Sequence, residues 1–105
     1  MSIAVCYLSR KLDSESLLWE FVESYKRYET GCAHDLIIIL KGYDNHDLSR
    51  VTERLKKTVI CEQLVLEDVG FDITSYREAA IFLNHRWVYF LNSYSQIGCK
   101  FWFCF

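Results

Sequence analysis

Four short apolar runs, separated by segments with helical periodicity, constrain the fold of this 105-residue chain more than any other feature. Such runs are typical of strands that are buried on both faces of a sheet. They cover residues 3–9, 35–43, 62–68 and 86–92. Parallel strands need long crossover connections, which are usually helices. The alternation therefore predicts an α/β fold, a three-layer α/β/α domain with a mainly parallel sheet and right-handed crossovers.

Apolar side chains recur at helical spacing in each segment between the runs. The first helix is expected over residues 17–28, with Asp13 or Ser14 as its N-cap. The second is expected over residues 46–58, and a third over residues 73–83. The chain is too short for a second core, so we expect one domain spanning residues 1–105.

Composition and charge exclude several classes of function. Half of the residues are hydrophobic (51%) and 16% are aromatic, which supplies material for a packed interior. A net charge of −2 argues against a nucleic-acid surface. No segment approaches the roughly 20 apolar residues that cross a bilayer, and the first residues lack the pattern of a signal peptide. These features predict a cytoplasmic protein without a transmembrane segment.

The cysteines indicate free thiols rather than a disulfide framework. Their number is odd and none forms a Cys-x-x-Cys motif; they occupy positions 6, 32, 61, 99 and 104. Reduced, mostly buried thiols are typical of cytoplasmic proteins. Zinc is a weaker alternative, because His34 lies close to Cys32 but no second ligand pair stands at a suitable spacing.

Polar side chains gather where the predicted strands end. Ligands of parallel α/β sheets bind outside the carboxyl ends of the strands, where the strand order reverses. The polar residues at these positions are Ser9, Arg10, Lys41, Tyr43, Asp44, Asp68, Asp72 and Asn92 to Ser95. This edge is therefore the expected functional site. The stretch Asn92 to Ser95 is either an ordinary turn or the lip of a ligand site.

The segment GFDITSYREAAIFLNHRWVYFLNSYS resembles nucleotide-sugar glycosyltransferases of the family-2-like and rhamnan-synthesis-like kind. In that family a Gly-aromatic-Asp turn opens a helix, and the next strand ends in a Leu-Asn-Ser or Leu-Asn-Asp-Ser motif. The runs IAVCYLSR and DLIIILKGY are also similar to the start of that fold. The resemblance spans about residues 3–97. It implies the Rossmann-like, nucleotide-binding half of a glycosyltransferase-A fold, acting in polysaccharide biosynthesis.

The resemblance implies a nucleoside site at the ends of the first three strands. Tyr7, Ser9 and Arg10 would line the base and ribose. Lys41 would belong to the same nucleotide site, and Asp72 would accept hydrogen bonds from the base or ribose. The ligand would be a nucleotide-diphosphate sugar, and the sugar would pass to a glycan acceptor.

The diphosphate would lie at Asn92, Ser93 and Tyr94, where the family carries an acidic motif that binds Mg or Mn. A hard divalent metal with oxygen ligands neutralises a leaving diphosphate. This chain has no carboxylate in LNSYS. Three alternatives follow: fewer protein groups hold the metal, Arg10 and Lys41 carry part of the charge, or the chain does not catalyse transfer.

The end of the chain also departs from the family. The catalytic base of an inverting transfer must reach the acceptor hydroxyl, and the family places it beyond the point where this chain stops. The ending GCKFWFCF differs from the usual continuation. We therefore expect a truncated or frame-shifted product, inactive alone and prone to self-association through an exposed sheet edge. The alternative is a small, non-catalytic, flavodoxin-like α/β binding module.

Overall fold

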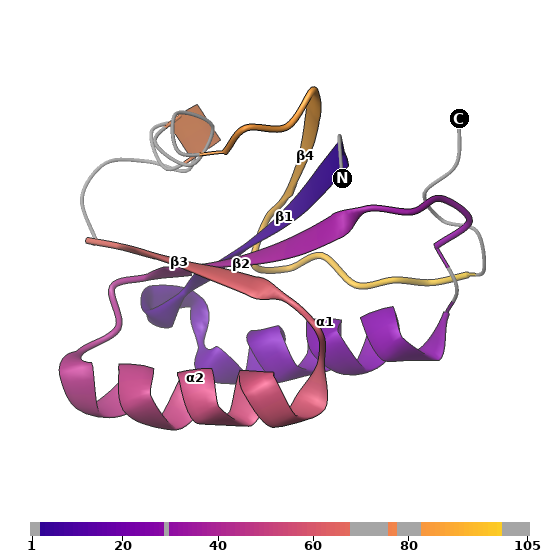
Figure 1. Cartoon of the computed structure of the whole chain (residues 1–105). Helices are drawn as coiled ribbons and strands as arrows, with labels where there is room; N and C mark the ends of the chain where they lie inside the picture. The colour runs from indigo at the N-terminus through magenta and orange to yellow at the C-terminus, as the bar shows by residue number, and fades with distance from the viewer. Residues whose placement is uncertain (1–2, 29, 68–75, 78–82, 100–105) are drawn as a thin grey trace.

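The computed structural model describes residues 3–28, 30–67, 76–77 and 83–99, and it has the predicted α/β architecture (Figure 1). In chain order the elements are β1 (Ile3–Arg10), a short 3-10 turn (Lys11–Asp13), α1 (Glu15–Arg27), β2 (Asp35–Lys41), α2 (Asn45–Thr58), β3 (Glu62–Leu66) and β4 (Trp87–Leu91).

The four described strands form one parallel sheet in the order β3-β2-β1-β4. The chain builds outward from β1 to β3 and then returns to place β4 on the other side of β1. The strand order therefore reverses between β1 and β4, which is the crevice where ligands bind in sheets of this kind. The parallel sheet predicted from the alternation is confirmed.

Helices α1 and α2 cover the same face of the sheet (Figure 1). Two right-handed crossovers that extend a sheet in one direction place their helices on one side. The side chains of β1 and β2 that face these helices alternate with those that face away. The core on the helical face consists of Val5, Tyr7, Leu18, Phe21, Val22, Leu36, Ile38, Leu40, Tyr43, Val51, Leu55 and Ile97.

The opposite face carries a smaller core. Cys6, Leu8 and Ile39 are completely buried there, although α1 and α2 lie on the other side. The ring of Tyr76 stacks on Phe90 with centroids 4.4 Å apart. Tyr76 and Arg77 are helical and Leu83 is not, while the rest of the third predicted helix lies outside the described residues. Tyr76 and Leu83 thus pack against the core on this face.

Polar N-caps fix the start of both complete helices. The Ser14 side chain accepts a hydrogen bond from the Ser16 amide at 3.3 Å, so α1 begins two residues before the first apolar position that the periodicity marked. Asp44 accepts from the Asp47 amide at 2.8 Å and begins α2. Both caps satisfy amides that have no partner within the helix.

The described cysteines are not disulfide-bonded, and they differ in exposure: Cys6 is buried, Cys32 and Cys61 are half-buried, and Cys99 is exposed. His34 lies 2.8 Å from the Tyr25 hydroxyl and 3.0 Å from the Cys32 carbonyl oxygen. In the part of the chain that the structure describes, no helix is both long and apolar enough to cross a membrane.

Candidate functional site at the carboxyl edge of the sheet

The two central strands end in a pair of cationic residues. Arg10 and Lys41 are register partners at the last position of β1 and β2. Leu8 and Ile39, two residues earlier in the same strands, pack on the face opposite the helices. Because side chains alternate between the two faces of a strand, Arg10 and Lys41 point toward that same face. Lys41 is completely buried, whereas Arg10 is partly exposed. Both residues have interaction partners within the protein.

Tyr7 lies inside the domain and not on a ligand-facing surface. Its hydroxyl donates to the Ser93 carbonyl oxygen at 2.5 Å and lies 3.2 Å from the Leu17 carbonyl oxygen. Its ring stacks on Phe21 with centroids 4.0 Å apart. Burial raises the pKa of the Tyr7 hydroxyl, so the group stays protonated and keeps its role as a donor.

Ser93 is also turned inward. It is only 3% exposed, and its Oγ donates to the Leu8 carbonyl oxygen at 3.0 Å while accepting from the Arg10 amide at 3.2 Å. Together with the bond from Tyr7, these contacts join the residues after β4 to the end of β1. The polar groups of Ser93 are therefore used to hold the strand ends together.

The stretch Asn92 to Ser95 is a hydrogen-bonded turn. The Ser95 amide donates to the Asn92 carbonyl oxygen at 3.1 Å. The Asn92 side chain accepts from the Tyr94 amide at 3.0 Å and the Ser95 hydroxyl at 3.3 Å, as in an Asx-turn. Of the three residues predicted at the diphosphate, Asn92 and Tyr94 are exposed, and the Tyr94 side chain projects 67% into solvent.

Ser9 joins the ends of β1 and β2 on the helical face. Its hydroxyl shares a hydrogen bond of 2.6 Å with the Tyr43 hydroxyl, and both residues are buried. Burial raises the pKa of Tyr43. Ser9 thus lies under the edge of the sheet, beside the ion-pair cluster that connects α1 to α2.

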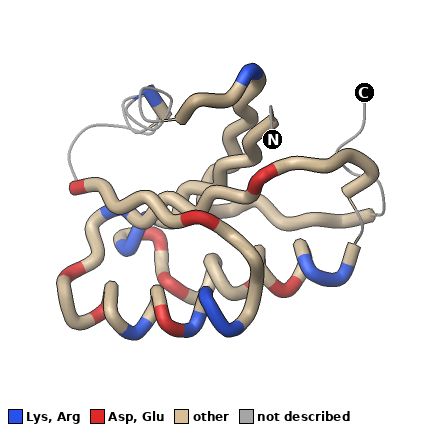
Figure 2. Tube along the Cα trace, in the orientation of Figure 1, with Lys and Arg blue, Asp and Glu red and all other residues tan. Residues whose placement is uncertain are grey.

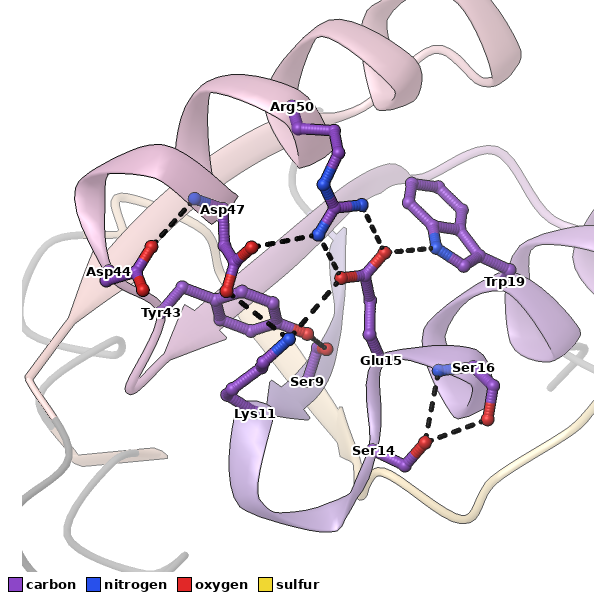
Figure 3. Close-up of polar contacts among 10 residues, drawn as sticks. All are labelled: Ser9, Lys11, Ser14, Glu15, Ser16, Trp19, Tyr43, Asp44, Asp47 and Arg50. Carbon is purple, nitrogen blue, oxygen red and sulfur yellow. Dashed lines mark hydrogen bonds and ion pairs between the residues drawn. The ribbon is translucent and has the colours of Figure 1, made fainter.

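Four charged side chains form that cluster (Figure 3). The Arg50 guanidinium donates two hydrogen bonds to the Glu15 carboxylate, at 2.7 and 2.6 Å, and a third to Asp47 at 3.1 Å. Lys11 lies 3.7 Å from Glu15 and 3.3 Å from Asp47. The hydrogen bond from Arg50 lowers the pKa of Glu15 to about 2. The cluster fixes the starts of both helices relative to each other.

A groove of about 420 Å³ opens next to the pair of cationic residues, between the β2–α2 connection and the end of β3. Leu66, one of its lining residues, is the register partner of Lys41. The groove is lined by Gly42, Tyr43, Asp44, Asn45, Leu48, Val65, Leu66 and Glu67. Gly42 has a φ of 79°, a left-handed conformation that favours glycine. Its amide donates a hydrogen bond to the Leu66 carbonyl oxygen at 3.2 Å.

The structure brings together most of the residues predicted at this edge, although in different roles. Arg10 and Lys41 lie side by side, Tyr7 contacts Ser93, and Ser9 contacts Tyr43. Asp68 and Asp72 lie outside the described residues. The sequence did not indicate the Glu15–Arg50 pair, whose members are 35 residues apart. The one feature of the sequence that could have pointed to this pair is the acidic residue in the first turn of each helix.

The residues after β4 do not fit a divalent metal. Ser93 Oγ is buried with two partners, Asn92 Oδ1 accepts two hydrogen bonds, and neither residue is charged. Within the described ranges, no three His, Cys, Asp or Glu side chains are grouped so that they could hold a metal ion. Compared with known proteins, the chain matches no family model, no curated protein and no solved structure.

Proposed function

We propose that the carboxyl edge of this sheet binds a nucleotide-diphosphate sugar, in the manner of a glycosyltransferase-A-like nucleotide-binding domain. The observation that carries this proposal is the register pairing of Arg10 with Lys41, at the ends of the two central strands. A diphosphate is the part of such a ligand that needs two adjacent positive charges. The partly exposed Arg10 would contact it, and the buried Lys41 would add charge from behind.

The neighbouring groove supports an uncharged, hydroxylated portion of the same ligand. None of its lining residues is cationic, so it does not favour a phosphate. Leu48 and Val65 offer an apolar surface, while the Asp44 and Glu67 carboxylates can accept hydrogen bonds from hydroxyl or ring N–H groups. Its volume of about 420 Å³ lies within the usual range of ligand sites.

In this proposal Tyr7, Ser9 and Ser93 are positioning residues. The hydroxyl groups of Tyr7 and Ser93 join β1 to the turn after β4, and the hydroxyl of Ser9 joins the end of β1 to Tyr43, so together they hold the edge in shape. Asp72 remains a proposed acceptor for the base or ribose. The proposal extends to a cytoplasmic protein of polysaccharide synthesis, with a glycan as sugar acceptor. No step is assigned to Mg or Mn, because the residues after β4 do not fit a metal.

One observation favours the alternative, a non-catalytic α/β binding module. The turn after β4 is closed by its own hydrogen bonds at the position where the glycosyltransferases carry an acidic motif. A module of this kind would use the same edge for binding and would lack the charged groups that assist departure of the diphosphate. It would bind a ligand without turning it over.

Titration calorimetry with uridine diphosphate glucose and thymidine diphosphate rhamnose tests the proposed function. Binding should weaken by about 10- to 100-fold in Arg10→Gln, the loss expected for a charge-assisted hydrogen bond. Arg27→Gln, which removes an exposed guanidinium from the far end of α1, should bind like the wild type. If the wild type bound neither of the two nucleotide sugars, the proposed function would be refuted. Unchanged binding by Arg10→Gln would refute the site.

A further inference from the structure

An exposed aromatic side chain stands at the carboxyl edge, on the β4 side of the sheet. Tyr94 is 67% exposed and directly follows Ser93, whose Oγ accepts a hydrogen bond from the Arg10 amide at 3.2 Å. Among the large hydrophobic residues that are exposed in the described ranges, the other aromatic one is Trp87, which begins β4 at the opposite end of that strand. Tyr94 therefore offers a ring beside the proposed diphosphate site.

The main chain around Tyr94 is held in place from both sides. Ser93 is bonded to the end of β1, and the Tyr94 amide donates to the Asn92 side chain at 3.0 Å. The bonds of the turn use the main chain of Tyr94 and not its ring. Turns favour Gly, Asn, Asp and Ser, so the turn itself does not require a tyrosine. A ring on a fixed main chain has few torsions to order when a ligand binds.

A nucleotide-diphosphate sugar carries its charges in the middle and an uncharged arm on each side. Arg10 lies at the end of β1, and the groove that includes Asp44 and Glu67 lies beyond β2, toward β3. Tyr94 follows β4, on the other side of β1. The strand order therefore puts the groove and Tyr94 on opposite sides of Arg10, as the two arms of such a ligand require.

The two sides differ in chemistry. The groove offers two carboxylates, and its aromatic residue, Tyr43, is only 8% exposed with its hydroxyl bonded to Ser9. It suits the hydroxyl groups of a sugar better than a flat ring. From Trp87 to Cys99 the chain has no Lys, Arg, Asp or Glu, and Figure 2 shows this stretch in tan. An uncharged side with an exposed ring suits a nucleobase, because every base has a face that stacks on an aromatic side chain.

We propose that the Tyr94 ring stacks on the nucleobase of the ligand and that the sugar occupies the groove. This inference rests on the proposed function and adds the direction in which the ligand lies along the edge. It replaces two base contacts that the resemblance implied, since Tyr7 and Ser9 are buried and bond within the protein. Tyr94, predicted at the diphosphate, would contact the base instead.

Titration calorimetry of the whole chain with uridine diphosphate glucose and with its dihydrouridine analogue tests the proposal. The analogue keeps the diphosphate, the sugar and the carbonyl and N–H groups of the base, but its ring is neither flat nor aromatic. Wild type should bind the analogue at least about fivefold more weakly than uridine diphosphate glucose, since stacking is lost. Tyr94→Ser should bind uridine diphosphate glucose about 5- to 100-fold more weakly than wild type does, and should bind the two ligands equally.

Two variants serve as controls. Tyr94→Phe keeps the ring and should bind uridine diphosphate glucose like wild type. Trp87→Ser removes an exposed aromatic side chain from the other end of β4 and should also bind like wild type. Urea unfolding of each variant separates loss of binding from loss of folding.

Unchanged affinity of Tyr94→Ser for uridine diphosphate glucose would overturn the stacking role, and so would equal binding of the two ligands by wild type. Equal weakening in Tyr94→Ser and Trp87→Ser would overturn it as well. If wild type bound neither ligand, the proposed function itself would fail. If Arg10→Gln weakened binding of uridine diphosphate glucose and Tyr94→Ser did not, the proposed function would stand and this inference alone would fail.

Discussion

The Tyr7 hydroxyl donates a hydrogen bond to the main-chain oxygen of Ser93, 86 residues further along the chain. The bond is buried, and it connects the central strand β1 to the turn that follows the edge strand β4. It joins the two neighbouring strands between which the strand order reverses. The shape of the proposed ligand edge therefore depends on a contact within the core.

Tyr7→Phe should destabilise the domain by about 1–2 kcal/mol, because it leaves a buried carbonyl oxygen without its donor. Urea unfolding followed by circular dichroism measures the change. Tyr94→Phe removes the same hydroxyl from a side chain that is 67% exposed and should leave the free energy of unfolding unchanged. Equal stability of Tyr7→Phe and wild type would show that the bond to Ser93 contributes nothing.

Glu15 should make stability depend on acid pH. Its pKa is lowered from 4.5 to about 2 in the folded state, chiefly by the hydrogen bond from Arg50. A lowered folded-state pKa adds stability that is complete above the unfolded-state pKa and is lost as pH falls toward the folded-state value. The free energy of unfolding should therefore decrease between about pH 5 and pH 2.

The variant Glu15→Gln should lose much of this decrease, and its deficit relative to wild type should be larger at pH 7 than at pH 2. Glu23→Gln serves as a control, because its side chain is 76% exposed and pairs with the exposed Arg27. Parallel unfolding curves for wild type and Glu15→Gln across this range would contradict the role given to the Arg50 contact.

Gly42→Ala should destabilise the domain by about 1–2 kcal/mol, the cost of a left-handed conformation in a residue with a Cβ. Gly42 has a φ of 79° where β2 leads into the groove. Gly98→Ala is the matched control, since a Cβ at that position meets no atom within 4 Å. Thermal unfolding compares the two. A Gly42→Ala variant as stable as Gly98→Ala would show that the turn tolerates a side chain.

Thiol labelling should distinguish Cys99 from Cys6. Cys99 is exposed, whereas burial raises the pKa of the Cys6 thiol to about 12. The thiolate is the reactive species, so iodoacetamide at pH 8 should modify Cys99 rapidly and Cys6 only after denaturation. Mass spectrometry of digested peptides reports each site separately. Rapid native labelling of Cys6 would mean that the central strand opens to solvent.

Local patterns in the sequence predicted the sheet, because residues buried on both faces leave a continuous apolar signature. The runs around Cys6 and Ile38 are of this kind, and both residues are completely buried. The cap of the first helix was likewise predicted at Asp13 or Ser14, and Ser14 is the cap. Strand ends were less exact: the run that began at Asp35 was expected to reach Tyr43, but β2 ends at Lys41, where Gly42 turns the chain.

The direction of polar side chains could not be read in the same way. Asn92 and Ser93 are both polar residues that follow β4, and the sequence gives no reason to treat them differently. In the structure the Ser93 hydroxyl donates to Leu8 of β1, whereas Asn92 is exposed. The Arg50–Glu15 pair depends on how α1 packs beside α2, which no local pattern records. Positions along the edge were therefore predictable, whereas the partner of each side chain required the fold.

The order of the strands also has a consequence for synthesis on the ribosome. Once Leu66 has emerged from the ribosome, β1, β2 and β3 are all available to pair, with α1 and α2 to cover one face. The other side of β1 must wait for Trp87 to Leu91. During that interval a nascent chain carries an unpaired apolar strand edge, the kind of surface that chaperones recognise and that invites aggregation.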